Sequence, residues 1–165
     1  AVSPYLQNKS VMAFAGGFAK DGKTALRFNA TGRAYPDVSA VGHQLIYIGW
    51  QNKDKVEGGT SFSAPIVAGM VAHINAHRRS RGRPTVGFVA PLLYKLHASS
   101  GEEESPAFHD IVYGDNHCTE SGCLCTEGFR AAPGWDAATG LGTINLGALI
   151  DLIDALDERR EKQAR

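Results

Sequence analysis

A glycine-rich segment that leads into an apolar helical pattern presents a serine suited to nucleophilic chemistry. The run Gly58–Pro65 reads Gly-Gly-Thr-Ser-Phe-Ser-Ala-Pro, and apolar residues at helical spacing follow it. Free N–H groups and the positive dipole end at the start of a helix favour negative charge near Ser61. Pro65 is expected in the first turn, where a missing N–H costs little. The alternative is that Ser61 only caps the helix, since serine is a preferred N-cap residue.

Two aspartates lie in segments whose composition suits a hard cation. Asp110 follows Phe108-His109, and Asp136 lies in the run 131–142, which is rich in glycine. Calcium binds six to eight oxygens and combines carboxylates with backbone carbonyls. Two adjacent carboxylates would repel each other, so a cation between them is physically reasonable. The alternative is that Asp110 and Asp136 are separate loop residues that stabilise turns.

The cysteines form a close group of odd number, Cys118, Cys123 and Cys125, so at least one has no disulfide partner within this chain. Pairing of Cys118 with one of the other two is expected, with the third thiol bonded elsewhere. A zinc-binding module that adds His109 and His117 is the minor alternative. It is disfavoured because the Cys-x-Cys spacing is unlike common zinc sites and because secretory cysteines oxidise.

The composition excludes several classes of partner. Hydrophobic residues make up 43% of the chain, and 17 basic residues balance 17 acidic ones. We therefore expect no binding to nucleic acid and no association with a membrane, since no apolar run reaches about 18 residues. The N-glycosylation motifs at Asn8 and Asn29 fit a secretory protein. The chain opens on Ala1 without an initiating methionine, which suggests a trimmed or fragmentary sequence.

The periodicity predicts the elements that position these residues. A buried strand is expected over Gln44–Trp50, with a polar hairpin tip over 52–57. A long helix follows Ser61 and stops at Gly82, and a short one begins near Pro91. A final helix capped by Asn145 extends to Leu156, after which the charged tail 157–165 is expected to fray into solvent.

Several segments together resemble one peptidase family. The run Gly58–Pro65 resembles the serine motif of the subtilisin-like clan, and more closely its sedolisin branch, because subtilisins usually have Met-Ala where this chain has Phe62-Ser63. The segments 31–40, 108–111 and 131–142 are similar to sedolisin motifs and occur in the same order. The resemblance implies an α/β fold, with a subtilisin-like, mostly parallel sheet flanked by helices. Residues 1–156 would form the C-terminal half of that catalytic domain.

The resemblance also implies the site residues. Ser61 would be the catalytic nucleophile, and one structural Ca²⁺ would be held by the carboxylates of Asp110 and Asp136. The carbonyls of Ile111, Ala132 and Gly134 would complete the protein ligands, with Ala132 standing where the family commonly has glycine.

The other triad members in this family are a Glu base and its Asp partner, and a further Asp stabilises the oxyanion. All three lie upstream of the matching region, and Asp37, Asp54 and Glu57 do not match those roles. The missing N-terminal part of the domain is therefore an expected partner, and we expect the isolated 165 residues to be inactive.

The resemblance implies peptides or unfolded proteins as substrates, cleaved at acid pH by an endopeptidase or a tripeptidyl exopeptidase. A secreted, lysosomal or vacuolar location follows from the same resemblance. The rival interpretations are a truncated binding or interaction module without catalysis and, less favoured, a subtilisin-like protease or the zinc module.

Overall fold

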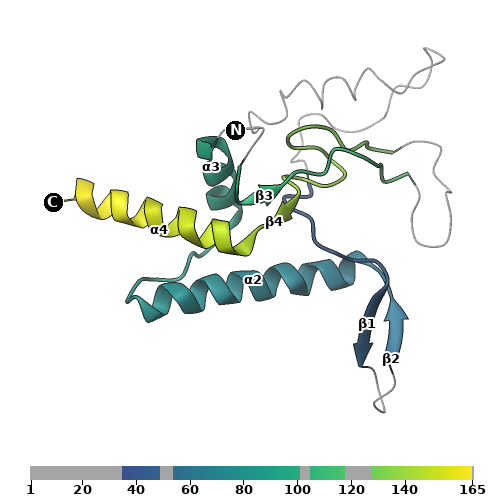
Figure 1. Cartoon of the computed structure of the whole chain (residues 1–165), viewed down its shortest axis with the longest axis horizontal. Coiled ribbons are helices and arrows are strands. Elements are labelled where there is room, and N and C mark those ends of the chain that lie inside the picture. The colour runs from purple at the N-terminus through teal and green to yellow at the C-terminus, as the bar shows by residue number, and fades with distance from the viewer. Residues whose placement is uncertain (1–34, 49–53, 101–104, 118–127, 165) are drawn as a thin grey trace.

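Within the residues that the structure describes, the chain forms three helices and four short strands. The computed structural model describes residues 35–48, 54–100, 105–117 and 128–164. In chain order the elements are β1 (Leu45–Ile48), β2 (Asp54–Glu57), α2 (Thr60–Ser80), α3 (Ala90–Ser100), β3 (Phe108–His109), β4 (Thr143–Ile144) and α4 (Leu146–Gln163). In Figure 1 the two long helices α2 and α4 run alongside each other, and the β1–β2 hairpin projects from the N-terminal end of α2.

Helix α2 forms where the sequence predicts it, because its apolar residues fall on one face. Ile74 is buried, and Val67 and Met70 pack against the same cluster. The helix ends at Ser80, and the amides of Gly82 and Arg83 donate to carbonyls of its last turn. These bonds satisfy backbone oxygens that have no partner inside the helix. The predicted stop at Gly82 is confirmed.

Helix α4 begins as predicted and extends further than predicted. The side chain of Asn145 accepts a hydrogen bond from the amide of Ala148 at 3.3 Å, which confirms Asn145 as the N-cap. The helix continues to Gln163, and Asp157 is only 9% exposed. The expectation of a frayed tail from residue 157 is therefore wrong as far as Gln163.

An ion pair explains why α4 continues. The guanidinium of Arg78 on α2 contacts the carboxylate of Asp157, and both side chains are largely buried. Arg78 also donates to the carbonyl of Pro84 at 2.7 Å. Arg83 contacts Asp157 and, at 3.1 Å, Glu161 one turn further along. A charged segment is thus held against the body of the protein by charges that lie far away in sequence.

The strands form two small antiparallel pairs. β1 pairs with β2, with Leu45 opposite Glu57, and β3 pairs with β4, with Phe108 opposite Ile144. The predicted hairpin is confirmed, but residues 54–57 are its second strand and not its tip. Among the residues that the structure describes, no parallel sheet is present. The single parallel contact there is the bridge between Ser39 and Thr143.

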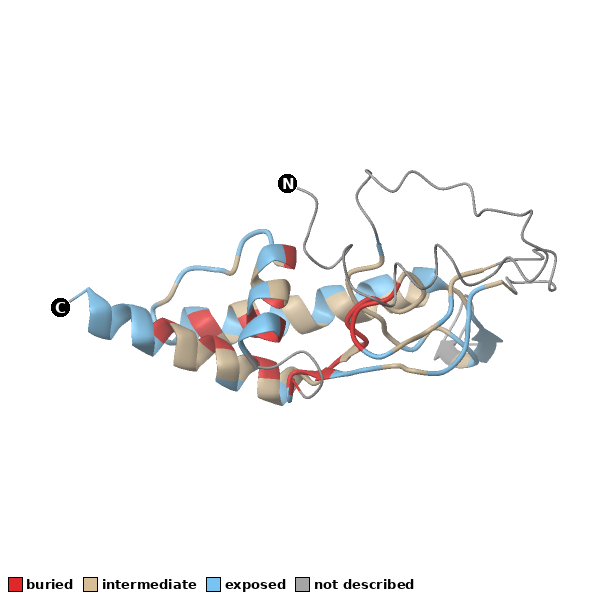
Figure 2. Cartoon of the chain, turned by 90° about the horizontal axis from the view of Figure 1, so that it is seen from above, coloured by how far each residue is buried: buried red, intermediate tan, exposed pale blue. Residues whose placement is uncertain are grey.

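The core lies where α2, α3 and α4 meet the β3–β4 pair. Buried residues concentrate on the facing sides of these helices and in the loop before β4 (Figure 2). The core cluster consists of Ile74, Leu93, Leu96, Ala107, Phe108, Trp135, Leu141, Ile144, Leu149 and Ile153. None of the helices in the described ranges is long and apolar enough to cross a membrane.

Candidate active site and cation-binding loop

Ser61 lies at the mouth of α2, exposed and in the first helical turn. The N-cap is Gly59, and no side chain caps the helix, so the interpretation of Ser61 as the capping residue is wrong. The Phe62 amide donates to the Gly59 carbonyl at 3.0 Å and closes this turn. The Ser61 hydroxyl is thus near amides at the positive end of a helix of 21 residues.

Pro65 lies deeper in α2 than the sequence predicted. The helix begins at Thr60, so Pro65 belongs to the second turn. In an α-helix the N–H of this position would donate to the carbonyl of Ser61, four residues earlier. Proline has no N–H, so the helix leaves the backbone oxygen of Ser61 without that bond.

The turn that carries Ser61 is bound to the segment before β1. The amide of Gly59 donates to the carbonyl of Gly42 at 2.6 Å. The hydroxyl of Ser63 donates to the carbonyl of Ala40 at 3.0 Å and contacts that of Val41 at 3.3 Å. A Cβ atom at Gly42 would lie 2.6 Å from the Ser63 hydroxyl, so this close approach requires glycine.

The acidic residues Asp37, Asp54 and Glu57 lie in surroundings other than those of Ser61. Asp37 accepts a hydrogen bond from the hydroxyl of Tyr94 at 2.8 Å. Asp54 and Glu57 are exposed at the two ends of β2. Across the described ranges, the Ser61 hydroxyl has no carboxylate or imidazole partner.

The two predicted calcium-binding carboxylates lie over one short loop. Asp110 accepts from the amide of Gly134 at 2.7 Å, and Asp136 accepts from the amide of Ala132 at 3.0 Å. Positions two residues apart in a chain are at most about 7 Å apart. Asp110 and Asp136 are therefore neighbours, although Asp110 lies 24 positions before the glycine that supplies its partner amide.

Asp136 also stabilises its own turn. The side chain is buried, with 3% exposure, and accepts from the amides of Ala138 and Thr139 at 2.9 and 2.8 Å. The hydroxyl of Thr139 lies 3.1 Å from both carboxylate oxygens. These donors stabilise the ionised carboxylate in a buried setting. Asp136 therefore does stabilise a turn, as the alternative to a calcium ligand proposed. Asp110 instead bonds to a segment that is distant in sequence.

The β3–β4 pair brings the two segments together. His109, next to Asp110, lies opposite Thr143, which follows the Asp136 loop. Gly142, which directly precedes Thr143, has φ +82°, and a Cβ atom there would lie 2.1 Å from the carbonyl oxygen of His109. Only glycine fits this contact, because any side chain would collide with the backbone.

The predicted donor set would suit a hard cation and not a soft one. Two carboxylates and three backbone carbonyls supply only oxygen, as calcium requires. In the described part of the chain no three His, Cys, Asp or Glu side chains form a metal-binding group. The predicted calcium ligands do not include three such side chains, since they are two carboxylates and three backbone carbonyls. Of the zinc alternative, His109 and His117 are described, while the cysteines and the glycosylation motifs lie outside the described residues.

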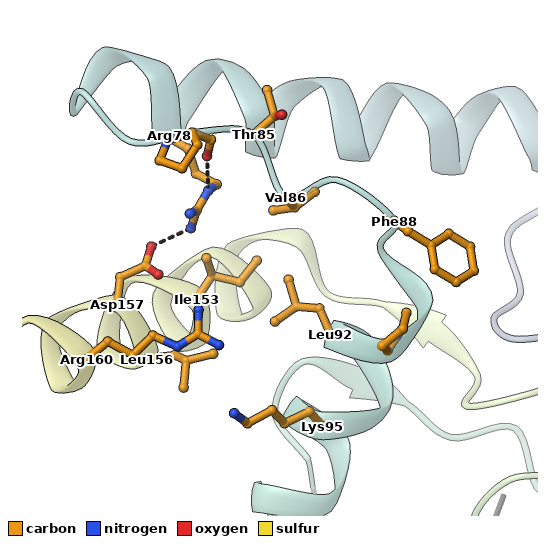
Figure 3. Close-up of a pocket in the computed structure, with 12 residues that line it drawn as sticks. Arg78, Thr85, Val86, Phe88, Leu92, Lys95, Ile153, Leu156, Asp157 and Arg160 are labelled. Atoms are coloured by element: carbon orange, nitrogen blue, oxygen red, sulfur yellow. Dashed lines mark hydrogen bonds and ion pairs between the residues drawn. The ribbon is translucent and has the colours of Figure 1, made fainter. Parts of the chain in front are cut away.

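A pocket of about 410 Å³ lies beside the C-terminal part of α2, where α3 and α4 also line it (Figure 3). Its walls include Val86, Leu92 and Ile153, and the Arg78–Asp157 pair borders it. About five turns of α2, on the order of 26 Å, separate Arg78 from Ser61. The pocket is therefore not part of the candidate active site.

Comparison with known proteins identifies the class. No protein-family model matches the chain. Over most of its length the chain is nevertheless homologous to peptidases of the sedolisin family. This relationship was predicted from the four sequence motifs and is confirmed.

The relatives come from distant organisms. Physarolisin of Physarum polycephalum is 38% identical over 94% of this chain, and the match covers 26% of physarolisin. Tripeptidyl-peptidase sed1 of Aspergillus fumigatus is 41% identical over 78% of this chain and 18% of the relative. Human tripeptidyl-peptidase 1 is 40% identical over 74% of this chain and 21% of the relative. The chain thus spans about a quarter or less of the length of these relatives.

A solved structure agrees with the sequence comparison. Pseudomonas sedolisin, a serine-carboxyl proteinase solved with two molecules of pseudo-iodotyrostatin, matches with a TM-score of 0.50 at 26% identity. The match covers 63% of this chain and 24% of sedolisin. The fold class is therefore α/β, as predicted, while the parallel sheet does not occur among the residues described.

Proposed function

We propose that this chain is the C-terminal part of the catalytic domain of a serine-carboxyl peptidase, with Ser61 as its nucleophile. The observation that carries the proposal is the exposed position of Ser61 in the first turn of α2, in a chain homologous to sedolisin-family peptidases. The substrates would be peptides or unfolded proteins. Endopeptidase and tripeptidyl exopeptidase action are both compatible with this assignment.

The chemistry would be acyl transfer to the Ser61 hydroxyl. Its oxygen attacks the carbonyl carbon of the scissile bond, the amine leaves, and an ester to Ser61 forms. The hydroxyl proton would pass to a base and from that base to the leaving amine, and no such base contacts Ser61 among the residues that the structure describes. The exposed start of α2 leaves room for the substrate, and its dipole favours the negative charge that develops at the carbonyl.

The rest of the domain would supply the missing groups. A Glu base, its Asp partner and the Asp that stabilises the oxyanion would lie in a part of the domain outside these 165 residues, which correspond to about a quarter of physarolisin. The same part would complete the mostly parallel sheet, and the bridge between Ser39 and Thr143 supports this extension because it already runs parallel.

The loop of Asp136 would hold one structural Ca²⁺. The carboxylates of Asp110 and Asp136 would bind it, together with the carbonyls of Ile111, Ala132 and Gly134. The ion would neutralise two adjacent carboxylates and fix the loop before β4. It would have no part in the chemical step.

The proposed cellular location follows from the same assignment to the serine-carboxyl peptidases. We propose a secreted, lysosomal or vacuolar protein, in which the cysteines at 118–125 form one disulfide and leave a thiol for the missing part. A non-catalytic interaction module is the second candidate, and it is favoured by the absence of a base partner for Ser61 in the described ranges.

Peptide hydrolysis by the complete protein tests the proposal. Ser61→Ala is expected to lower kcat at acid pH by at least about 10⁴-fold, since no other group can form the ester. Ser80→Ala, which removes a hydroxyl bonded to His77 at the far end of α2, is the matched control and should retain activity. Turnover that survives Ser61→Ala would contradict the assignment. Turnover by the isolated 165 residues that Ser61→Ala abolishes would contradict their expected inactivity and leave Ser61 as the nucleophile.

A further inference from the structure

We propose that Ser39 and Ser63 are positioning residues that join the loop of Asp136 to the turn that carries Ser61. The inference rests on the proposed function in one respect, namely that Ser61 is the nucleophile. Two segments about 75 residues apart in the chain are connected by hydrogen bonds to the backbone and side chains of residues 39–41.

The first link joins the Asp136 loop to the segment before β1. Thr139 donates its amide to Asp136 at 2.8 Å, and its carbonyl accepts from the hydroxyl of Ser39 at 2.7 Å. The amide of Ser39 donates to the carbonyl of Gly142 at 2.9 Å. Ser39 is therefore bound through both its side chain and its backbone to the loop that contains Asp136.

The second link joins that segment to the start of α2. The hydroxyl of Ser63 donates to the carbonyl of Ala40, the residue after Ser39, and also contacts the carbonyl of Val41. Ser63 is only half-buried, yet its hydroxyl bonds to backbone 22 or 23 positions away in sequence. Side-chain bonds to backbone commonly stay local, so this distant clamp specifies tertiary position.

Ser61 lies between two such clamps. On one side the Gly59 amide is bound to the Gly42 carbonyl at 2.6 Å, and on the other side Ser63 is bound to Ala40. The backbone from Gly59 to Ser63 is thus fixed at both ends against one extended segment. A nucleophile displaced by about 1 Å can lose on the order of 10²-fold in rate, so such clamping has a catalytic consequence.

An energetic coupling between Ser39 and Ser63 would distinguish positioning of the Ser61 turn from local stabilisation by each hydroxyl. If each hydroxyl only adds a local bond, loss of Ser39 affects its own surroundings and leaves the turn of Ser61 unchanged. If the two serines act through the shared segment, loss of Ser39 loosens the turn of Ser61 as well. A double-mutant cycle separates these cases, because independent effects add and coupled effects do not.

Amide hydrogen exchange in the 165-residue chain, followed by NMR, measures the coupling at the Phe62 amide, which closes the turn. Ser63→Ala and Ser39→Ala are each expected to speed this exchange by about fivefold. The double variant is expected to be no more than about twofold faster than Ser63→Ala. Ser39→Thr keeps the hydroxyl and should restore the slow rate.

The controls make each outcome decisive. Ser80→Ala, at the other end of α2, should leave Phe62 unchanged. The Leu149 amide, bonded to Asn145 at 2.9 Å, reports on global opening and should change less than about twofold in every variant. Unchanged exchange at Phe62 in Ser39→Ala, equal acceleration at Leu149, or additive effects in the double variant would each overturn the proposal.

Exchange requires no turnover and no metal, so its result is independent of the peptidase assay. In the complete peptidase, Ser63→Ala should lower kcat by at least about tenfold with KM unchanged, since neither serine contacts the reacting atoms. If exchange is coupled while Ser61→Ala retains turnover, the proposed function fails and the structural coupling remains. If turnover depends on Ser61 while exchange is uncoupled, the present inference fails alone.

Discussion

The carboxylate of Asp110 accepts a hydrogen bond from the backbone amide of Gly134 at 2.7 Å. This bond places Asp110 beside the short loop that Asp136 also holds, through the amide of Ala132. Two acidic side chains from separate segments thus meet over the same backbone. A cation bound between them would offset the repulsion of their charges, which is the physical basis of the proposed calcium site.

Calcium should bind to this loop and stabilise the chain. At free Ca²⁺ one hundred times Kd, the stabilisation is about 2.7 kcal/mol, which calorimetry detects as a higher Tm. Terbium luminescence excited through the neighbouring Trp135 gives an independent measure of binding. Asp110→Asn and Asp136→Asn should each weaken binding by at least about tenfold, since each removes a charge from the ligand set.

The control for charge alone is Asp151→Asn on the exposed side of α4. It removes the same charge away from the loop and should leave terbium binding unchanged. Equal Tm values in excess chelator and in excess Ca²⁺ would contradict the calcium site. The role of Ser61 as the nucleophile would then rest on the peptidase assay alone.

Gly142→Ala should disrupt the contact between the Asp136 loop and β3. The added methyl would lie 2.1 Å from the His109 carbonyl oxygen, at a φ of +82°. We expect a loss of about 3 kcal/mol or more in the free energy of unfolding, measured by urea denaturation. Gly87→Ala is the matched control, because Gly87 has φ +69° but nothing within 4 Å of the added atom. That variant should lose only about 1–2 kcal/mol. Equal losses would show that the close contact is unimportant.

Asp157→Ala should destabilise the chain strongly. It leaves the guanidinium of Arg78 largely buried without its carboxylate, which typically costs about 3–5 kcal/mol. Glu161→Ala removes a carboxylate from the same helix, but that side chain is 59% exposed and should cost less than about 1 kcal/mol. Thermal unfolding followed by circular dichroism compares the two. A loss at Asp157 no larger than that at Glu161 would mean that the pair does not hold the end of α4.

The sequence predicted the elements whose signals are local. The apolar spacing from Val67 to Ile74, the stop at Gly82 and the Asn145 cap all act within a few residues, so they could be recognised without a structure. The apolar run 44–50 and the polar stretch after it likewise predicted a hairpin, although residues 54–57, expected at its tip, form its second strand. The family was predicted because its motifs are short, specific and occur in order.

What the sequence missed depends on contacts between distant residues. Asp157 looked like part of a solvated tail, because its partner Arg78 lies on another helix. Ser39 showed no sign of its bond to Thr139, 100 residues away. The role of Ser63 was equally hidden, although its place inside the serine motif was a signal that could have drawn attention to it. Pro65 was misplaced by one turn because the sequence does not fix where α2 begins.

The covalent intermediate provides the most direct test of the account. The complete protein would be mixed with a peptide substrate, quenched rapidly in acid and digested, and the peptide that contains Ser61 would be weighed by mass spectrometry. The account predicts that this peptide gains the mass of the acyl part of the substrate, and that Ser61→Ala abolishes the gain. An acyl group on a different residue, or full turnover with no acyl group at Ser61, would contradict it.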